Sequence, residues 1–245
     1  MRTKITQKHR LFCLPSAGSS ASMYRHWDEK LTEVQVTPIE YPGRGARFSA
    51  PYAKSIKSLA REVANIIIRE MTNEETPNFS LFGHSLGALI SWEVCLELDR
   101  KQYSLPQSLW VSARKAPHFK PSAERRSDLS DKDLLSLLNN MGGTPAELLA
   151  SPEFQALMLP IVRADFKLHD NYLYDQEHNS TPRLAIPIIA LGGKVDEQVP
   201  YDTLREWQQY TTTGFEQFEF SGGHFYLQEP DFLDWLQGKL PLLNN

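Results

Sequence analysis

The sequence has few cysteines, no long hydrophobic run and no excess of positive charge, and each absence excludes a class of protein. Its 245 residues include only two cysteines, Cys13 and Cys95, so a framework of disulfide bonds is excluded. No apolar run approaches the roughly 18 residues that a membrane-spanning helix needs. The formal net charge of −4 at pH 7 gives no general attraction to nucleic acid or to anionic lipid.

Targeting and cofactor motifs are also missing. The apolar stretch Leu11–Leu14 is too short for a secretory signal and ends at Pro15. We therefore expect a cytoplasmic protein whose two cysteines are reduced thiols in apolar surroundings. The sequence has no C-x-x-C pair, no H-E-x-x-H, no P-loop and no G-x-G-x-x-G after a strand pattern, and His169-Asp170 alone is too little for a metal site. We expect neither a metal nor a nucleotide cofactor.

Hydrophobic patterning predicts alternating strands and helices. Strands are predicted at Leu11–Leu14, Val34–Ile39, Phe79–Phe82, Leu109–Ser112, Ile186–Leu191 and Phe215–Phe220. Helices are predicted over Ile56–Ile67, Leu86–Arg100 and Tyr201–Tyr210, and along Met23, Trp27 and Leu31. This alternation predicts an α/β fold, with an open, mostly parallel twisted sheet and helices on both faces. The length suits a single domain over residues 1–245.

The segment from about residue 117 to 182 interrupts this alternation. Capping patterns at Ser130, Thr144 and Ser151 predict three helices, and Pro160 is expected to kink or break the third. The many leucines in this segment present more apolar surface than short helices bury alone. We interpret the segment as an all-helical lid insertion over an active site, the alternative being a packing embellishment.

A candidate nucleophile lies where a predicted strand meets a predicted helix. Gly83-His84-Ser85-Leu86-Gly87 has the form G-x-S-x-G, directly after Phe79–Phe82. In this context the motif is a nucleophile elbow, a tight turn that holds a serine hydroxyl above the edge of the sheet. The flanking glycines avoid collisions within the turn. Ser85 is therefore the predicted nucleophile, the alternative being a plain glycine turn.

A serine hydroxyl needs a base, and the base needs an acid to orient it. His224 follows the last predicted strand in a glycine-containing loop, whereas we interpret His9, His26 and His178 as structural. Asp196 follows the strand Ile186–Leu191, and the chain order Ser85, Asp196, His224 is that of the α/β-hydrolase triad. The other acidic candidates are Asp165, Asp170 and Asp175 in the helical insertion and Asp202 in a first helical turn, while Glu197 would point elsewhere.

The oxyanion of such a reaction needs backbone N–H donors. One donor is expected from Leu86, the residue after the nucleophile. The other is expected from the loop after the first strand, where we select Ala17. A basic stretch that begins the insertion is either a solvated face or a docking patch for an acidic partner. It consists of Arg114, Lys115, Lys120, Arg125 and Arg126.

A set of short motifs extends over nearly the whole sequence: Leu14–Gly18 with Tyr24 and Trp27, Tyr41–Gly45, Phe82–Ala88, Ser112–His118, Gly142–Pro145 with Glu147–Leu149, Leu159-Pro160, Arg163–Phe166, Leu191–Gly193 with Asp196, and Gly222–Phe225. In these motifs the sequence resembles the stand-alone type II thioesterases of nonribosomal peptide and polyketide synthetases. The run Pro42–Gly45 and the lid motifs are more specific than the elbow, which many hydrolases share. In the first loop the family usually has a histidine followed by two glycines, where this sequence has Ser16 and Gly18-Ser19.

The resemblance implies an α/β-hydrolase fold with a helical lid and a Ser85, Asp196, His224 triad. It implies hydrolysis of acyl or aminoacyl thioesters on the phosphopantetheine arm of carrier proteins, which clears stalled or misprimed synthetases. It further implies a monomer that needs no cofactor and whose partners are acyl or peptidyl carrier domains, not nucleic acid or membrane. The alternatives are a medium-chain acyl-carrier thioesterase of fatty acid synthesis, a general carboxylesterase, and a non-catalytic carrier-binding protein.

Overall fold

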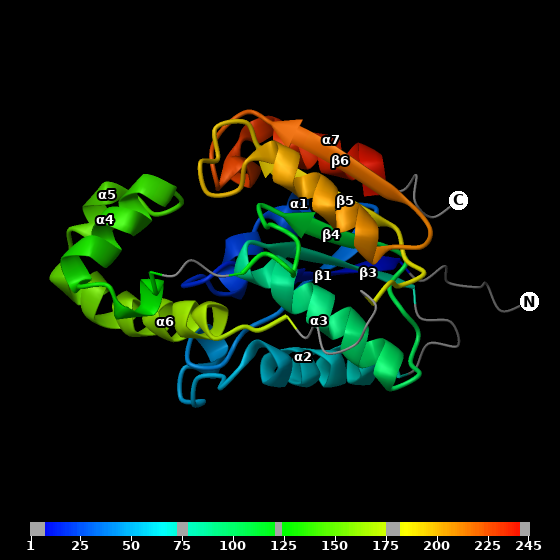
Figure 1. The fold of residues 1–245 in the computed structure, drawn as a ribbon, viewed down its shortest axis with the longest axis horizontal. Helices are drawn as coiled ribbons and strands as arrows, with labels where there is room; N and C mark the ends of the chain where they lie inside the picture. Colours follow the sequence, from blue (N-terminus) through cyan, green and yellow to red (C-terminus); the bar gives the residue numbers. More distant parts are fainter. Residues whose placement is uncertain (1–7, 73–77, 121–123, 175–181, 241–245) are drawn as a thin grey trace, which may run out of the picture.

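A six-stranded sheet forms the centre of the computed structural model, which describes residues 8–72, 78–120, 124–174 and 182–240 (Figure 1). Every neighbouring pair of strands is parallel, in the order β2-β1-β3-β4-β5-β6. The strands are β1 (His9–Leu14), β2 (Val34–Pro38), β3 (Phe79–His84), β4 (Leu109–Ser112), β5 (Ile188–Gly193) and β6 (Phe215–Phe220). The predicted parallel α/β sheet is therefore confirmed.

The burial of the strands follows their sequence pattern. The central strands β3, β4 and β5 are buried at every position, as their continuous apolar runs predict, whereas the edge strand β6 has only half-buried and exposed residues. β5 begins two residues later than predicted because Pro187 has no N–H for the sheet ladder. Among the described residues, no helix combines the length and hydrophobicity that crossing a bilayer requires.

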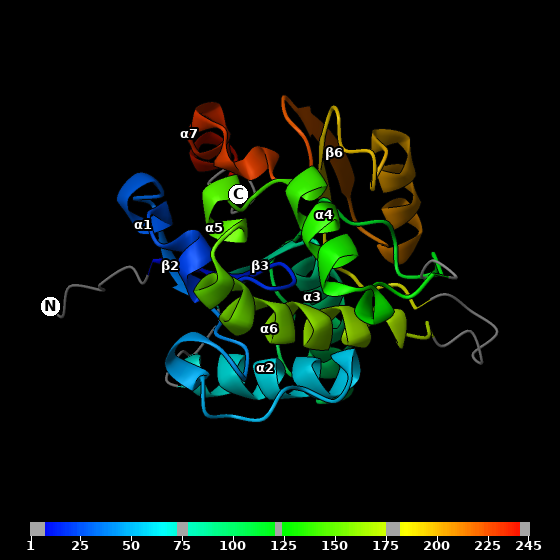
Figure 2. The same cartoon turned by 90° about the vertical axis from the view of Figure 1, so that its left-hand side faces the viewer.

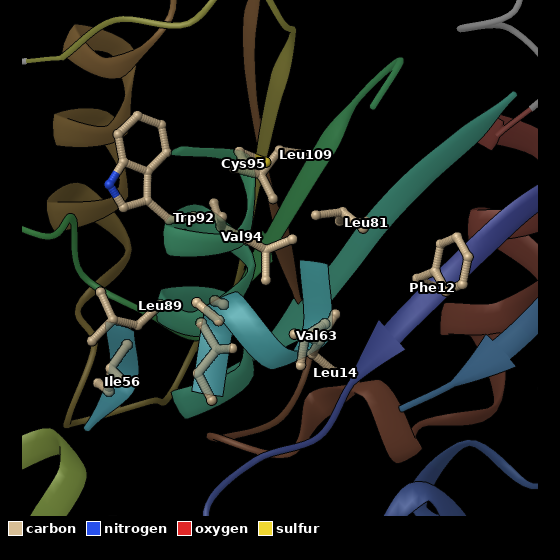
Figure 3. Close-up of a cluster of buried hydrophobic side chains, with 14 of the residues drawn as sticks. Phe12, Leu14, Ile56, Val63, Leu81, Leu89, Trp92, Val94, Cys95 and Leu109 are labelled. Carbon is tan, nitrogen blue, oxygen red and sulfur yellow. The ribbon is translucent and has the colours of Figure 1, made fainter. Parts of the chain in front are cut away.

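Three helical elements cover one face of the sheet: α2 (Ile56–Glu70), α3 (Leu86–Arg100) and the 3-10 helix η4 (Tyr201–Tyr210). Figure 3 shows Val63 of α2 and Leu89 of α3 in the same cluster as Phe12 and Leu81 of the sheet. Cys95 of α3 belongs to this cluster, and burial raises the pKa of its thiol. Both cysteines are buried and free, as predicted. This face of the sheet is thus covered by α3 together with α2 and η4, and the elbow lies at the start of α3.

The opposite face is covered by α1 (Trp27–Lys30) and α7 (Pro230–Lys239), with the 3-10 helix η1 (Ala21–Tyr24) beside them. The single helix predicted along Met23, Trp27 and Leu31 is wrong, because two short helical pieces occupy that segment. Tyr24 explains the break: its hydroxyl donates to Leu14 O (2.7 Å), which ties η1 to the end of β1.

Between β4 and β5 the chain forms α4 (Asp131–Met141), α5 (Ala146–Leu149) and α6 (Pro152–Asp170), which lie together beyond one end of the sheet (Figures 1 and 2). Ser130 and Ser151 cap α4 and α6 as predicted, whereas α5 has Pro145 and not Thr144 at its N-cap. Of the two expected effects of Pro160, a break does not occur: α6 continues through it, since buried Met158, Leu159 and Val162 hold both halves in the same cluster.

Candidate active site

The predicted site residues converge at the carboxyl end of the parallel sheet, where open α/β sheets bind ligands. Ser85 follows β3 and precedes α3, with φ 54° and ψ −111°, a strained backbone conformation for a residue other than glycine. Its N–H donates to Ser112 O of the neighbouring strand β4 (2.8 Å). The strained turn therefore raises the serine side chain above the sheet edge.

The two glycines of the elbow are required by close backbone contacts. A Cβ at Gly83 would overlap the backbone of Gly87 across the turn, and a Cβ at Gly87 would overlap Leu14 O at the end of β1. The chain packs this closely because α3 must begin directly over β1 and β3. The motif spacing is thus a consequence of the packing between helix and strands.

Ser85, His224 and Asp196 form one hydrogen-bonded chain. Ser85 Oγ lies 3.0 Å from His224 Nε2, and His224 Nδ1 lies 2.7 Å from Asp196 Oδ2. In the neutral tautomer that suits these contacts, Nδ1–H donates to the carboxylate and the serine hydroxyl donates to Nε2. The side chains of His224 and Asp196 are 4% and 1% exposed. The structure thus brings together three residues that are far apart in the sequence.

The second oxygen of Asp196 is also satisfied. Oδ1 accepts the backbone N–H groups of Gln198 (2.9 Å) and Val199 (3.1 Å). These bonds stabilise a buried carboxylate and fix its orientation toward the imidazole. The loop after β5 therefore presents an oriented anion to His224.

The other acidic candidates lie in different environments. Asp170 accepts the N–H of Ser127 (2.9 Å), and its pKa falls to about 2 because His169 and Ser127 donate to it, which outweighs its burial. Asp202 is exposed in the first turn of η4. Asp175 lies outside the described residues. Asp165 contacts Arg44, as described below.

His84, the variable residue of the elbow, lies against the triad. Its ring centroid is 5.4 Å from that of His224, and its Nδ1 contacts Ser112 Oγ (2.8 Å). Burial, and then the neighbouring His224, hold the pKa of His84 well below its ordinary value. His84 therefore stays neutral at pH 7 and adds no charge beside the base.

The expected oxyanion donors flank Ser85. Leu86 is the first residue of α3, and Ala17 lies in the loop after β1, on the wall of a cavity that Ser85 also lines. Within the part of the chain that the structure describes, neither backbone N–H has a hydrogen-bond acceptor. Both donors are therefore available to a ligand oxygen.

A buried ion pair holds the loop that bears Ala17. Both Arg44 terminal nitrogens donate to the Asp165 carboxylate (2.5 and 2.6 Å), and the side chains are 4% and 2% exposed. Gly18 N–H donates to the same carboxylate (2.8 Å), and Arg44 also donates to Ser19 O (3.1 Å). Asp165 belongs to α6, so this cluster, which we call the loop clamp, connects the helical insertion to the candidate oxyanion loop.

Two cavities meet at Ser85. The first has a volume of about 260 Å³ and is lined by Ser85, Ala113, Arg114, Lys115, Phe119, Lys120, Arg126, His169, Gln198, Val199 and His224. The second has a volume of about 80 Å³ and is lined by Ser85, the loop 16–19, Phe225, and Leu138, Met141, Gly142, Gly143, Thr144, Phe154, Met158, Val162 and Phe166 of the insertion. We call them the cationic cavity and the apolar cavity.

Four of the five residues of the basic stretch line the cationic cavity, and the fifth lies outside it. Arg114, Lys115, Lys120 and Arg126 line the cationic cavity, whereas Arg125 pairs with Asp128 (3.2 Å) and donates to Asn171 (2.9 Å). Among the described residues no group of histidine, cysteine, aspartate and glutamate side chains could hold a metal ion.

The comparison with protein families shows the family to which this chain belongs. The thioesterase family, described as "Thioesterase domain", has a model that matches residues 9–240. The chain belongs to the thioesterase family. The match includes the elbow, the helical insertion and the loop of His224. The protein is accordingly a hydrolase, as predicted.

Relatives and solved structures agree with this assignment. The thioesterase is 34% identical over 221 residues to Thioesterase PikA5 of Streptomyces venezuelae, covering 90% of this chain and 76% of that protein. It is 30% identical to RedJ, a thioesterase from the prodiginine pathway of Streptomyces coelicolor, with a TM-score of 0.86 and coverage of 97% and 86%. The type II thioesterase BorB of the borrelidin cluster gives 30% identity, a TM-score of 0.82 and coverage of 98% and 94%. The predicted family and fold class are confirmed.

Neither the loop clamp nor the cationic cavity follows from the sequence pattern. Arg44 belongs to the run Pro42–Gly45, one of the motifs that carry the family resemblance, but nothing in its spacing points to Asp165, 121 residues away. The basic stretch is visible in the sequence, but which of its residues line the cavity depends on how the chain turns after β4.

Proposed function

We propose that this thioesterase hydrolyses acyl or aminoacyl thioesters on the phosphopantetheine arms of carrier proteins in a nonribosomal peptide or polyketide pathway. The pathway assignment rests on similarity to PikA5, RedJ and BorB. The single observation that carries the chemistry is the contact of Ser85 with His224 and of His224 with Asp196. Acyl and peptidyl carrier domains are the proposed partners of a monomer that acts in the cytoplasm without a cofactor.

In the proposed mechanism Ser85 is the nucleophile and His224 is its base. Ser85 Oγ attacks the thioester carbonyl carbon while His224 Nε2 takes the hydroxyl proton, and Asp196 stabilises the imidazolium that results. The N–H groups of Leu86 and Ala17 donate to the oxyanion, and each such donor contributes roughly 10²–10³ in rate.

Collapse of this intermediate breaks the carbon–sulfur bond, and the sulfur leaves as a thiol with the proton from His224. Because a thiol has a pKa near 8.5, it leaves with less protonation than an alcohol requires. Water then attacks the acyl-Ser85 ester while His224 takes its proton. The bond between the acyl carbon and Ser85 Oγ breaks, His224 returns the proton to Ser85 Oγ, and the carboxylic acid is released.

We propose that residues 117–182 are a lid insertion in a single domain over residues 1–245. The apolar cavity supports this proposal, since residues of the insertion, among them Leu138, Phe154 and Met158, form most of its wall. An acyl chain bound there would be shielded from water by the same helices. A carrier-bound arm enters when the helices move apart.

Substitution of the nucleophile tests the function. Ser85→Ala should lower kcat for butyryl-pantetheine and for butyryl carrier protein by roughly 10⁴-fold or more, because no other hydroxyl contacts His224 Nε2 in the described residues. Thermal unfolding of the variant should match the parent. Full activity in a folded Ser85→Ala protein would reject the mechanism.

Two controls separate the proposed substrate from its alternatives. An ethyl butyrate oxoester should be hydrolysed more slowly than the thioester of the same acyl group, whereas a general carboxylesterase would prefer it. A fluorophosphonate probe should label Ser85 covalently, and absence of labelling would favour a non-catalytic carrier-binding protein.

A further inference from the structure

The cationic cavity carries positive charge that the triad chemistry does not use. Its lining residues include Arg114, Lys115, Lys120 and Arg126 and, among the described residues, no aspartate or glutamate. Lys115 Nζ lies over the ring of Phe119 (5.8 Å) and the Arg126 guanidinium lies over Phe166 (5.8 Å), contacts that leave both charges unneutralised. The cavity therefore favours an anionic or strongly hydrogen-bond-accepting ligand.

Arg114 is the cation with the fewest partners. Its Nε is buried without a hydrogen bond, and its guanidinium has no ion pair within the described residues. Burial lowers the pKa of Arg114 to about 10, so the side chain is still charged at neutral pH. The side chain as a whole is half-buried on the cavity wall, so its terminal nitrogens can donate to a ligand that enters the cavity.

The nearby titratable groups neutralise only part of the positive charge of this cavity. Burial and then the charge of Arg114 lower the pKa of His169 to about 4, so the imidazole is uncharged at pH 7. The carboxylates of Asp170 and Asp196 attract Arg126 and offset part of this charge. Among the described residues the four cations of the lining still outnumber these two carboxylates, so a net positive charge remains for a bound group.

The place of His224 indicates which part of a thioester enters this cavity. His224 must give its proton to the departing sulfur, so the leaving group lies on the same side as the imidazole. His224 lines the cationic cavity, whereas Ala17, the candidate donor to the carbonyl oxygen, lines the apolar cavity. The acyl group then occupies the apolar side and the thiol arm the cationic side.

We propose that the cationic cavity binds the phosphorylated arm of the leaving group. This assignment rests on the proposed function. An extended chain advances roughly 3.4 Å for every three bonds, as in an extended polypeptide. On this basis the phosphate of a fully extended phosphopantetheine arm lies about 15 Å from its sulfur atom. The half-buried Arg114 suits the amide carbonyl oxygens nearer the sulfur, and Arg126 with the exposed Lys120 suits the phosphate.

Substrates that differ only in charge test this assignment. The parent enzyme is assayed with butyryl-pantetheine, butyryl-phosphopantetheine and glutaryl-pantetheine. We expect kcat/KM for the phosphorylated arm to exceed that for pantetheine by about tenfold or more, mainly through KM and less so at high salt. Equal values for the two arms overturn the proposal. A preference for glutaryl over butyryl on the same arm also overturns it, because the anion would then be on the acyl side.

Substitutions of the cations show which side chains bind the phosphate and which bind the rest of the arm. Lys120→Gln combined with Arg126→Gln should reduce the phosphate preference to about twofold or less, and Arg114→Gln should lower kcat/KM for both arms while the preference remains. Arg125→Gln, which removes a neighbouring cation outside the cavity, is the matched control and should leave the ratio unchanged. An unchanged preference in the double variant overturns the assignment.

These outcomes are distinct from failure of the proposed function. If the parent enzyme hydrolyses none of the thioesters, the function itself is rejected. If it hydrolyses both butyryl substrates equally, the function stands and the arm site is rejected. Because the ratio is measured first on the parent enzyme, an unfolded variant does not decide the question.

Discussion

The two cavities that meet at Ser85 differ in charge, in size and in the elements that build them. The cationic cavity is formed largely by loops after β4 and β5 together with η3 (Arg126–Asp128), and four of its lining residues are cations. The apolar cavity is formed by the loop after β1 and by α4 and α6, and none of its lining residues is charged. Ser85, the proposed nucleophile, thus faces two different environments, so each half of a thioester can be recognised by different chemistry.

The largest effect is expected from the loop clamp, which holds the loop that lines the apolar cavity. Asp165→Asn leaves the Arg44 guanidinium buried without its counter-ion, which should cost about 3–5 kcal/mol of unfolding free energy. Loss of the clamp should also displace Ala17 and lower kcat roughly 100-fold. Urea unfolding and steady-state kinetics measure the two effects separately.

A double variant separates stability from positioning. Arg44→Met with Asp165→Leu removes both charges and should recover most of the unfolding free energy. The Gly18 N–H still lacks its acceptor, so kcat should stay at least about tenfold below the parent while KM changes little. Full recovery of kcat would show that the clamp supports only the fold.

A charge placed in the apolar cavity tests whether the acyl chain binds there. Leu138→Lys should lower kcat/KM for octanoyl-pantetheine by about tenfold and affect acetyl-pantetheine less, because only the long chain must contact the lysine. Leu137→Lys adds the same charge to α4 outside the lining of the cavity. Equal losses for both chain lengths would place the acyl group elsewhere.

The smallest expected effect is the pH dependence caused by His169. Its pKa of about 4 in the folded protein lies below the ordinary 6.5, so between these values the unfolded chain binds a proton that the folded protein excludes. Stability should therefore fall as the pH drops from 6.5 to 4, by at most about 1.4 kcal/mol per unit from this group. His169→Gln should flatten that dependence in urea unfolding at pH 7 and pH 4.5. A slope identical to the parent would contradict the assignment.

Local patterns predicted elements with strong, continuous signals. The apolar run before Ser85 and the helical spacing after it lie where β3 and α3 were expected, and Ser130 and Ser151 cap their helices. The predictions failed where distant contacts decide the local structure. Tyr24 anchors its segment to β1 and interrupts the expected helix, and burial of the residues around Pro160 keeps α6 continuous.

The sequence by itself determined the elbow, the order of Ser85, Asp196 and His224, and the parallel sheet, because these depend on short-range patterns and on the rule that carboxyl ends of parallel strands share an edge. Only the tertiary structure decided that Asp165 pairs with Arg44 and not with His224, and that Arg114 faces a cavity whereas Arg125 does not. Residue type sets which partners a charged side chain needs. Which partner it reaches depends on how helices and loops far apart in the chain pack against the sheet.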